Sequence, residues 1–278
     1  MNKIRKIIKK VVANLEPIAQ LIILVAIVII VLKINGVQLL EKFYDKQDLG
    51  FDNLKYYLIL KLGNIAIIAL LDGLVLYNFR QHNKGKSFNR GNVYHNYPYI
   101  WFFIGSKILG YGKCTLKLVP IYLQFKLVLK DTFNEYLIGS DDDYPKKENE
   151  IIKVKKKNMV NQFNEINLVF SDTYRVKQNQ LPVNKKNLPT IFISRDNNDN
   201  NRYYSDMFIN KIIQEVRNLP ENIRINIFAT TNPKHTKYIV EQAFKLADRG
   251  NINKLYVFQQ ESTGNRVFKE KGIKVYEN

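Results

Sequence analysis

Three loops in the last third of the chain carry residue types that could bind an anion. Each loop follows a short apolar run, at residues 190–193 (TIFI), 225–229 (INIFA) and 255–258 (LYVF). The candidate ligand-binding residues are hydroxyls, an amide and cations: Ser194, Arg195, Arg202, Thr231, Asn232, Lys234 and Arg266. Guanidinium and ammonium groups pair with phosphate oxygens, and Asn232-Pro233 opens a predicted helix whose free N–H groups attract anions. The pattern predicts a site for an anionic, nucleotide-like ligand.

Two other interpretations of these loops stay open. Surface loops are polar in most proteins, and Thr231 or Asn232 can serve only to cap the following helix. Alternatively, Asp196, Arg202 and His235 could form an acid–base set acting on a phosphorylated or lipid-linked substrate. A lone histidine at a helix start is more often solvated than catalytic, so we expect His235 to be exposed to water.

The sequence lacks the motifs that would indicate a catalytic or cofactor site. It contains no G-x-x-x-x-G-K-[ST] loop, no G-x-G-x-x-G after a strand and no G-x-S-x-G elbow. Its three histidines and single cysteine, Cys114, have no metal-ligand spacing, and one cysteine cannot form an intrachain disulfide. We therefore expect a protein that is not an enzyme and that carries no metal and no cofactor.

The elements that must position these loops follow a β/α pattern over residues 159–278. Apolar runs typical of strands alternate with amphipathic stretches typical of helices. The predicted strands are 166–170, 190–193, 225–229, 255–258 and 273–276, and the predicted helices are 203–219 and 232–249. This alternation predicts an α/β domain with a short, mostly parallel, Rossmann-like sheet. The carboxyl ends of parallel strands share one edge, so we expect the three loops to meet there.

Two apolar segments near the N-terminus predict a transmembrane hairpin. Residues 17–35 form the first helix, because they begin with sixteen residues that carry no charge and no polar stripe. Residues 56–79 form the second helix, although Lys61 and Asp72 interrupt it. Residues 36–55 form the extracytoplasmic loop between them.

The positions of the cations orient this hairpin. Residues 1–16 form a basic N-terminus, and four further cations with no acid follow the second helix, whereas the 36–55 loop is mixed. The positive-inside rule then places both termini in the cytoplasm. Gln20 and Asp72 are the polar residues within the helices, and we expect them to hydrogen-bond across the hairpin, with an ion path as the alternative.

The middle of the chain is less regular. Residues 80–140 form a juxtamembrane segment that we predict to be β-rich, because 115–130 alternates with period two; a helix starting at Pro120 is the alternative. The aromatic stretch 94–111 is predicted either to dock on the membrane surface or to form the first strand of the soluble part. Residues 141–158 read as a charged, solvated linker.

Composition narrows the functional classes. The chain has 278 residues, 46% hydrophobic content and a formal charge of +18, which excludes a wholly disordered protein. We expect no nucleic-acid partner, because membrane topology and lysine-rich linkers account for much of the charge. The expected partners are the bilayer, a nucleotide-like ligand and a second copy or a membrane-complex subunit. The favoured function is a membrane-anchored sensor or effector, and the alternative is an accessory subunit of a transfer or secretion apparatus.

Overall fold

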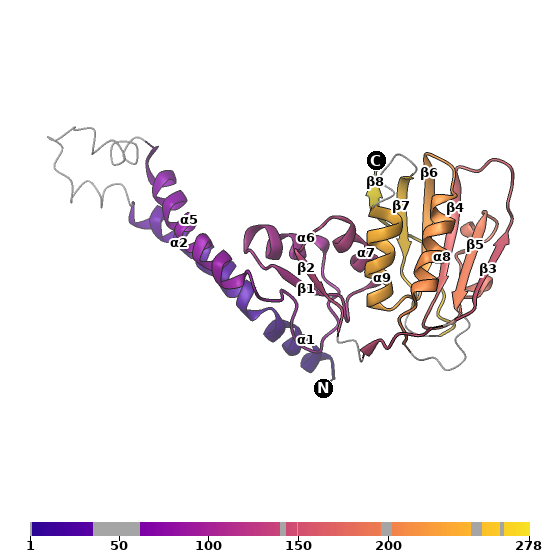
Figure 1. Cartoon of the computed structure of the whole chain (residues 1–278). Coiled ribbons are helices and arrows are strands. Elements are labelled where there is room, and N and C mark those ends of the chain that lie inside the picture. Colours follow the sequence, from indigo (N-terminus) through magenta and orange to yellow (C-terminus); the bar gives the residue numbers. More distant parts are fainter. Residues whose placement is uncertain are drawn as a thin grey trace. The chain divides into compact units, whose positions relative to one another are not determined.

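The computed structural model describes residues 2–35, 62–139, 143–148, 150–195, 202–245, 252–261 and 264–278. The chain forms two compact units (Figure 1). The first comprises Met1–Val93 and Ile100–Lys113, and the second comprises Tyr94–Tyr99 and Cys114–Asn278. The backbone therefore passes between the units three times, which ties them together covalently at three places.

Three helices form most of the described part of the first unit. They are α1 (Asn2–Ala13), α2 (Leu15–Ile34) and α5 (Asn64–Asn83). Within the residues that the structure describes, α2 is the one helix whose length and hydropathy suit a membrane crossing. α5 begins inside the predicted second span and ends four residues beyond position 79, at Asn83. Residues 56–61 of that predicted span lie outside the described part.

The prediction of a β-rich juxtamembrane segment is wrong. The segment contains more helix than strand, with α6 (Tyr99–Phe103), a π-helical turn (Ile104–Ile108) and α7 (Ile121–Leu129). Its strands β1 (Lys113–Thr115) and β2 (Glu135–Leu137) form a two-stranded sheet, and Ser87 adds an isolated bridge to Lys113. The aromatic stretch 94–111 is accordingly helical rather than a first strand.

The helical alternative for residues 115–130 is the correct one. Pro120 stands at the N-cap of α7, where its missing N–H costs nothing. The apparent period of two arose because α7 buries residues on more than one face, including the pairs Leu123/Leu127 and Gln124/Val128 at helical i, i+4 spacing.

A six-stranded mixed sheet organises the second unit. Its order is β3-β5-β4-β6-β7-β8. The strands are β3 (Ile152–Lys157), β4 (Glu165–Ser171), β5 (Thr190–Arg195), β6 (Ile223–Ala229), β7 (Ile252–Phe258) and β8 (Ile273–Glu277). The four inner strands are parallel, as predicted, but β3 and β8 add antiparallel edges.

The prediction of a charged linker over residues 141–158 is wrong for residues 152–157, which form the edge strand β3. Residues 152–157 pair along their whole length with β5 instead of remaining in solvent. Lysines are tolerated there because an edge strand leaves their side chains access to water, and edge lysines also discourage pairing with other chains. Lys156 forms an ion pair with Glu215 (2.8 Å) of the helix α8 (Asp206–Arg217), so this side of β3 faces α8.

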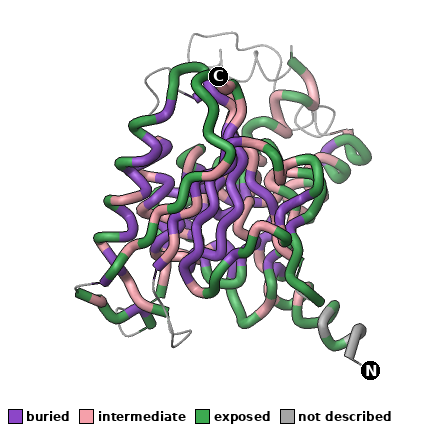
Figure 2. The backbone as a smooth tube through the Cα atoms, turned by 90° about the vertical axis from the view of Figure 1, so that its right-hand side faces the viewer, coloured by how far each residue is buried: buried purple, intermediate pink, exposed green. Residues whose placement is uncertain are grey.

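Buried residues are concentrated in the central strands of the sheet (Figure 2). α7, α8 and α9 (Pro233–Ile239), which a π-helical turn (Val240–Lys245) continues, pack together on one face. The hydroxyl of Ser205 caps α8 by accepting the Phe208 N–H (3.3 Å). The other face carries a separate cluster of buried residues: Val169, Val176, Leu181, Phe228, Phe258 and Phe268.

Candidate functional site

Asp172 lies directly after β4 and is the centre of a buried ion-pair network. Its Oδ1 accepts a hydrogen bond from Arg195 (2.6 Å), while its Oδ2 accepts the Asn232 N–H (2.9 Å) and lies 2.7 Å from His235 Nδ1. Arg195 also donates from Nε to Glu150 (2.8 Å). Because these contacts join the ends of β4 and β5 to the start of α9, the network holds the loops at this edge of the sheet in place.

His235 is a buried part of this network, so the expectation of a solvated side chain is wrong. Its side chain is 0% exposed. Its Nε2 accepts the backbone N–H of Ser205 (2.8 Å), which assigns the ring proton to Nδ1, facing Asp172. Both ring nitrogens are therefore occupied, and neither is available to a substrate.

The carboxylate of Asp172 occupies the position at the start of α9 where we expected a ligand anion. The Asn232 side chain caps the same helix by accepting the His235 N–H (2.8 Å). Burial raises the pKa of Asp172, but the contacts with His235 and Arg195 and the Asn232 N–H outweigh it, so the pKa is lowered overall. An internal aspartate thus supplies the negative charge that the helix start attracts.

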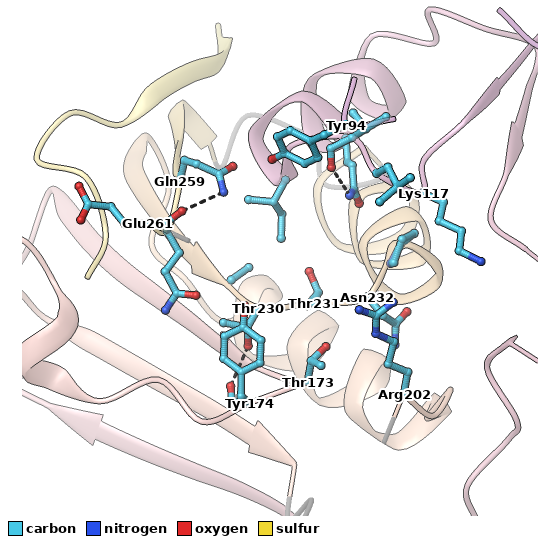
Figure 3. A pocket seen from close by; sticks show the side chains of 17 residues that line it. Tyr94, Lys117, Thr173, Tyr174, Arg202, Thr230, Thr231, Asn232, Gln259 and Glu261 are labelled. Atoms are coloured by element: carbon cyan, nitrogen blue, oxygen red, sulfur yellow. Dashed lines mark hydrogen bonds between the residues drawn. The ribbon is translucent and has the colours of Figure 1, made fainter. Parts of the chain in front are cut away.

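A polar pocket of about 350 Å³ lies beside this network, at the carboxyl ends of β4, β6 and β7 (Figure 3). Its walls come from the loops after these strands, from Arg202, and from residues on and before α7. The lining residues are Tyr94, Lys117, Leu118, Val119, Ile121, Gln124, Thr173, Tyr174, Arg202, Ala229, Thr230, Thr231, Asn232, Pro233, Gln259, Gln260 and Glu261.

Three amide atoms in the lining are buried without a hydrogen-bond partner. They are Oε1 of Gln124, Oε1 of Gln259 and Nε2 of Gln260. Gln124 is 6% exposed, and its Nε2 donates to the Val119 carbonyl (2.8 Å), which fixes the orientation of the amide. Gln259 is fixed in the same way, by donating to the Gln260 carbonyl (3.2 Å). Buried polar groups are nearly always paired, so this group of atoms is suited to a polar ligand.

Cations and aromatic rings complete the pocket. Arg202 and Lys117 are exposed cations in its wall, and Glu261 is the opposing acid. The Arg266 guanidinium lies over the ring of Tyr174, 4.6 Å from its centroid. Arg266 is therefore adjacent to Tyr174, which lines the pocket, without being a lining residue itself. The lining therefore offers amide, hydroxyl, aromatic and cationic contacts together.

The structure brings some of the predicted binding residues together and separates others. Arg202, Thr231 and Asn232 line the pocket, and Arg266 adjoins it through Tyr174. Thr231 Oγ1 is 2.7 Å from Thr236 Oγ1, so its hydroxyl already has a partner.

The other three predicted residues lie elsewhere. Arg195 is buried in the Asp172 network, and Lys234 lies over the ring of Tyr204 (4.6 Å). Ser194 lines a separate groove on the sheet. Asp196 lies outside the described residues.

Sequence reasoning missed Asp172 and the three glutamines. Asp172 follows the predicted strand 166–170 almost directly. The rule that ligands bind beyond the carboxyl ends of parallel strands, which we applied to the other three loops, would therefore have indicated it. Gln259 and Gln260 follow the strand LYVF in the same way. No local signal indicates Gln124, because it lies on α7, a helix that we expected to be a strand.

Gln20 and Asp72 do not pair with each other. Gln20 and Asn83 exchange two hydrogen bonds (2.9 and 3.1 Å) between α2 and α5, and Asn83 also donates to the Leu109 carbonyl (2.8 Å). Asn83 lies eleven residues beyond Asp72, or about 16 Å along a helix, which places Asp72 too far from Gln20. Within the described residues, Asp72 Oδ1 is buried without a hydrogen-bond partner.

The fold and the site describe a protein with an apolar N-terminal helix and a mixed α/β unit that contains a polar pocket. The family model of the SMODS- and Ubiquitin system-associated 2TM effector domain, SUa-2TM, matches residues 3–276, and the chain belongs to this family. Comparison with curated proteins finds no match.

Solved structures of Cap4 SAVED/CARF-domain containing receptors resemble part of the chain. The Acinetobacter baumannii receptor with the cyclic trinucleotide 3'3'3'-cAAA has a TM-score of 0.39 and 9% identity, over 63% of this chain and 41% of that one. The Moraxella osloensis receptor has a TM-score of 0.34 and 10% identity, over 63% and 40%. This chain thus matches less than half the length of either receptor, and similarity at these TM-scores carries no argument about function.

Proposed function

We propose that this chain is a membrane-anchored effector whose second unit binds a nucleotide-like ligand and passes the bound state to a transmembrane hairpin of α2 and α5. The observation that carries the proposal is the group of three buried, unpartnered amide atoms in one pocket. Leaving such atoms unpaired costs free energy of folding, about 1–3 kcal/mol for each group. A ligand that pairs with them recovers part of this cost.

The chemistry of the pocket favours a nucleotide over other anions. Base edges present donors and acceptors at fixed spacing, and side-chain amides pair with them, often in bidentate fashion. Gln124 and Gln259 offer acceptors and Gln260 a donor, while Arg202 supplies charge for a phosphate. Lys117, whose Nζ is 3.4 Å from Asp143 Oδ1, lies in the same wall. The volume of about 350 Å³ also lies within the range of small-molecule sites.

The order of the inner strands supports the same location. Along the sheet they run β5-β4-β6-β7, which is second, first, third and fourth in chain order, the order of flavodoxin-like α/β sheets. After β4 the chain adds β5 on one side of it, and then adds β6 on the other side of β4. The direction in which strands are added therefore reverses between β4 and β6. Ligands bind at such a reversal, and Tyr174 after β4 and Thr231 after β6 both line the pocket.

The path of the chain supports coupling to the membrane part. Tyr94, the first residue after one of the passages between units, lines the pocket, and Lys117 does so four residues after another passage. The His95 N–H donates to the Leu118 carbonyl (2.8 Å) and joins these two segments within the second unit. A ligand that displaces Tyr94 and Lys117 would therefore also displace the chain segments that lead to the first unit.

Two features support a role in binding without turnover. The Nε2 lone pair of His235 is taken by the Ser205 N–H, so the histidine has no free base for a substrate. Burial raises the pKa of the Cys114 thiol, so the thiolate nucleophile is not formed near neutral pH.

The membrane topology in the proposal has two spans with both termini in the cytoplasm. α2 supplies the first span, and the family description names a two-TM effector, which supports α5 as the second. Arg80 lies near the end of α5 and adds to the positive charge expected on the cytoplasmic side.

Replacing Gln260 by leucine tests the pocket in the full-length protein in detergent. Isothermal titration with a panel of mononucleotides and cyclic oligonucleotides should give a binder for the wild type, and Gln260→Leu should weaken its Kd about tenfold. The thermal midpoint should stay level or rise, because the variant removes an unpaired buried donor.

Gln214→Leu is the matched control, since Gln214 lies exposed on α8, away from the pocket. Its Kd should match that of the wild type. The proposal fails if the wild type binds no nucleotide at millimolar concentration, or if both variants bind as the wild type does.

A further inference from the structure

A second groove lies on the sheet face opposite α8, and it is strongly basic. Its volume is about 340 Å³. Its lining contains five cations and no carboxylate: Lys153, Lys155, Lys157, Ser171, Arg175, Val176, Lys177, Gln178, Phe192 and Ser194. It shares no lining residue with the polar pocket, so what it binds is independent of the function proposed above.

The register of β3 on β5 explains how the cations gather. Lys153 lies opposite Ser194 and Lys155 opposite Phe192, so these side chains share one face of the sheet. The alternate residue Lys156 points to the other face, where it pairs with Glu215. Successive groove lysines are therefore about 6.6 Å apart along the strand, two residues at about 3.3 Å each.

Three of the five cations in the groove have no acidic partner among the described residues. Lys155, Arg175 and Lys177 form no ion pair with any carboxylate in the described part of the chain. Lys157 donates to the neutral Gln178 side chain and lies 5.9 Å from the centroid of the Phe192 ring. The charge of Lys155, Lys157, Arg175 and Lys177 therefore remains available to a partner.

We propose, in departure from the expectation of no nucleic-acid partner, that this groove binds the phosphate backbone of a single-stranded nucleic acid. A row of cations at regular spacing suits a polymer with repeated negative charges better than it suits a single phosphate or headgroup. The half-buried Phe192 ring in the groove adds an aromatic surface of the kind on which bases stack. Binding of this type depends on backbone charge and is independent of base sequence.

Fluorescence anisotropy with a labelled 12-nucleotide single strand tests the proposal on full-length protein in detergent. The logarithm of the binding constant should fall linearly with the logarithm of salt concentration, with a slope of about −3.5 if all five cations engage. Lys155→Glu combined with Arg175→Glu should weaken the Kd at least tenfold. Inorganic polyphosphate should compete less well than the oligonucleotide, because it lacks bases to stack on Phe192.

The matched control is Lys130→Glu combined with Lys271→Glu, which changes the net charge equally at exposed lysines outside the groove. Its Kd should change less than twofold, and thermal unfolding should show both double variants folded. Equal loss in the two double variants would overturn the proposal, as would equal competition by polyphosphate. Binding to vesicles with anionic headgroups but not to the oligonucleotide would overturn it as well.

Discussion

At the scale of single residues, Asp172 links the fold to the pocket. Its carboxylate pairs with Arg195 and His235, and it accepts the N–H of Asn232, the N-cap residue of α9. Removing Asp172 leaves His235 without its carboxylate and Arg195 with Glu150 alone, which costs more than the ion pair contributes by itself. The same residue thus determines where the polar loops lie and why a ligand phosphate cannot occupy the start of α9.

Asp172→Asn should destabilise the second unit by about 3–5 kcal/mol, because Arg195 and His235 lose a buried anionic partner. In the full-length protein in detergent, this should lower the thermal midpoint by on the order of 10 °C. Asp131→Asn is the control, since that carboxylate pairs with Lys245 but is 63% exposed, and its midpoint should shift by less than about 2 °C. Equal midpoints for Asp172→Asn and wild type would contradict this account.

The pH dependence of stability should follow from the lowered pKa of Asp172. A carboxyl with a lower pKa in the folded state stabilises the fold fully above the unfolded value, about 4, and this contribution is lost as pH falls through the folded pKa. Thermal midpoints measured between pH 7 and pH 2 should therefore drop below pH 4 in the wild type. The drop should be smaller in Asp172→Asn. Parallel curves of thermal midpoint against pH for the two proteins would show that Asp172 does not cause the drop.

At the scale of elements, the pairing of α2 with α5 rests on a polar contact within an apolar interface. Gln20 and Asn83 are 5% and 0% exposed, and their two reciprocal hydrogen bonds set the register of the helices. At the other end of the pair, Asn64 donates to Asn35 (3.3 Å). Such interhelical bonds select one alignment from several that apolar surfaces alone would permit.

Gln20→Leu should destabilise the helix pair by about 1 kcal/mol, because it removes both bonds to Asn83. Asn83→Leu should cost more, since the Leu109 carbonyl also loses its donor. Thermal unfolding in detergent measures both, with Gln81→Leu as a control at an exposed position of α5. A Gln20→Leu protein as stable as the control would show that the contact does not set the alignment.

At the scale of the whole molecule, charge is distributed unevenly along the chain. The formal charge is +18, and basic residues lie on α1 before the apolar helix α2 and again after α5. Part of the remaining charge gathers on β3 and its neighbours, where it lines the basic groove. In the two proposals made above, this charge serves two purposes, which are orientation in a membrane and binding of an anionic partner.

A reporter fused after Asn278 tests the proposed topology. Green fluorescent protein at this point should fluoresce and alkaline phosphatase should be inactive, because the positive-inside rule retains both ends in the cytoplasm. The same reporters inserted within residues 36–55 should give the opposite pattern. An active phosphatase at the C-terminus would exclude a hairpin with both termini inside.

The sequence by itself determined the elements whose signal is local. The uncharged run of α2, the capped and amphipathic α8, and the apolar strands β6 and β7 were all evident, because periodicity and capping depend on neighbours within a few residues. The parallel arrangement of the inner strands followed from their alternation with helices.

Only the tertiary structure decided which side chains meet. Asp172 and His235 are 63 residues apart, as are Gln20 and Asn83, and Gln124 reaches the pocket from a helix outside the β/α pattern. The lysines of β3 gather into a groove only because that strand pairs with β5. Contacts of this kind arise from strand order and packing between distant segments, which leave no periodic trace in the local sequence.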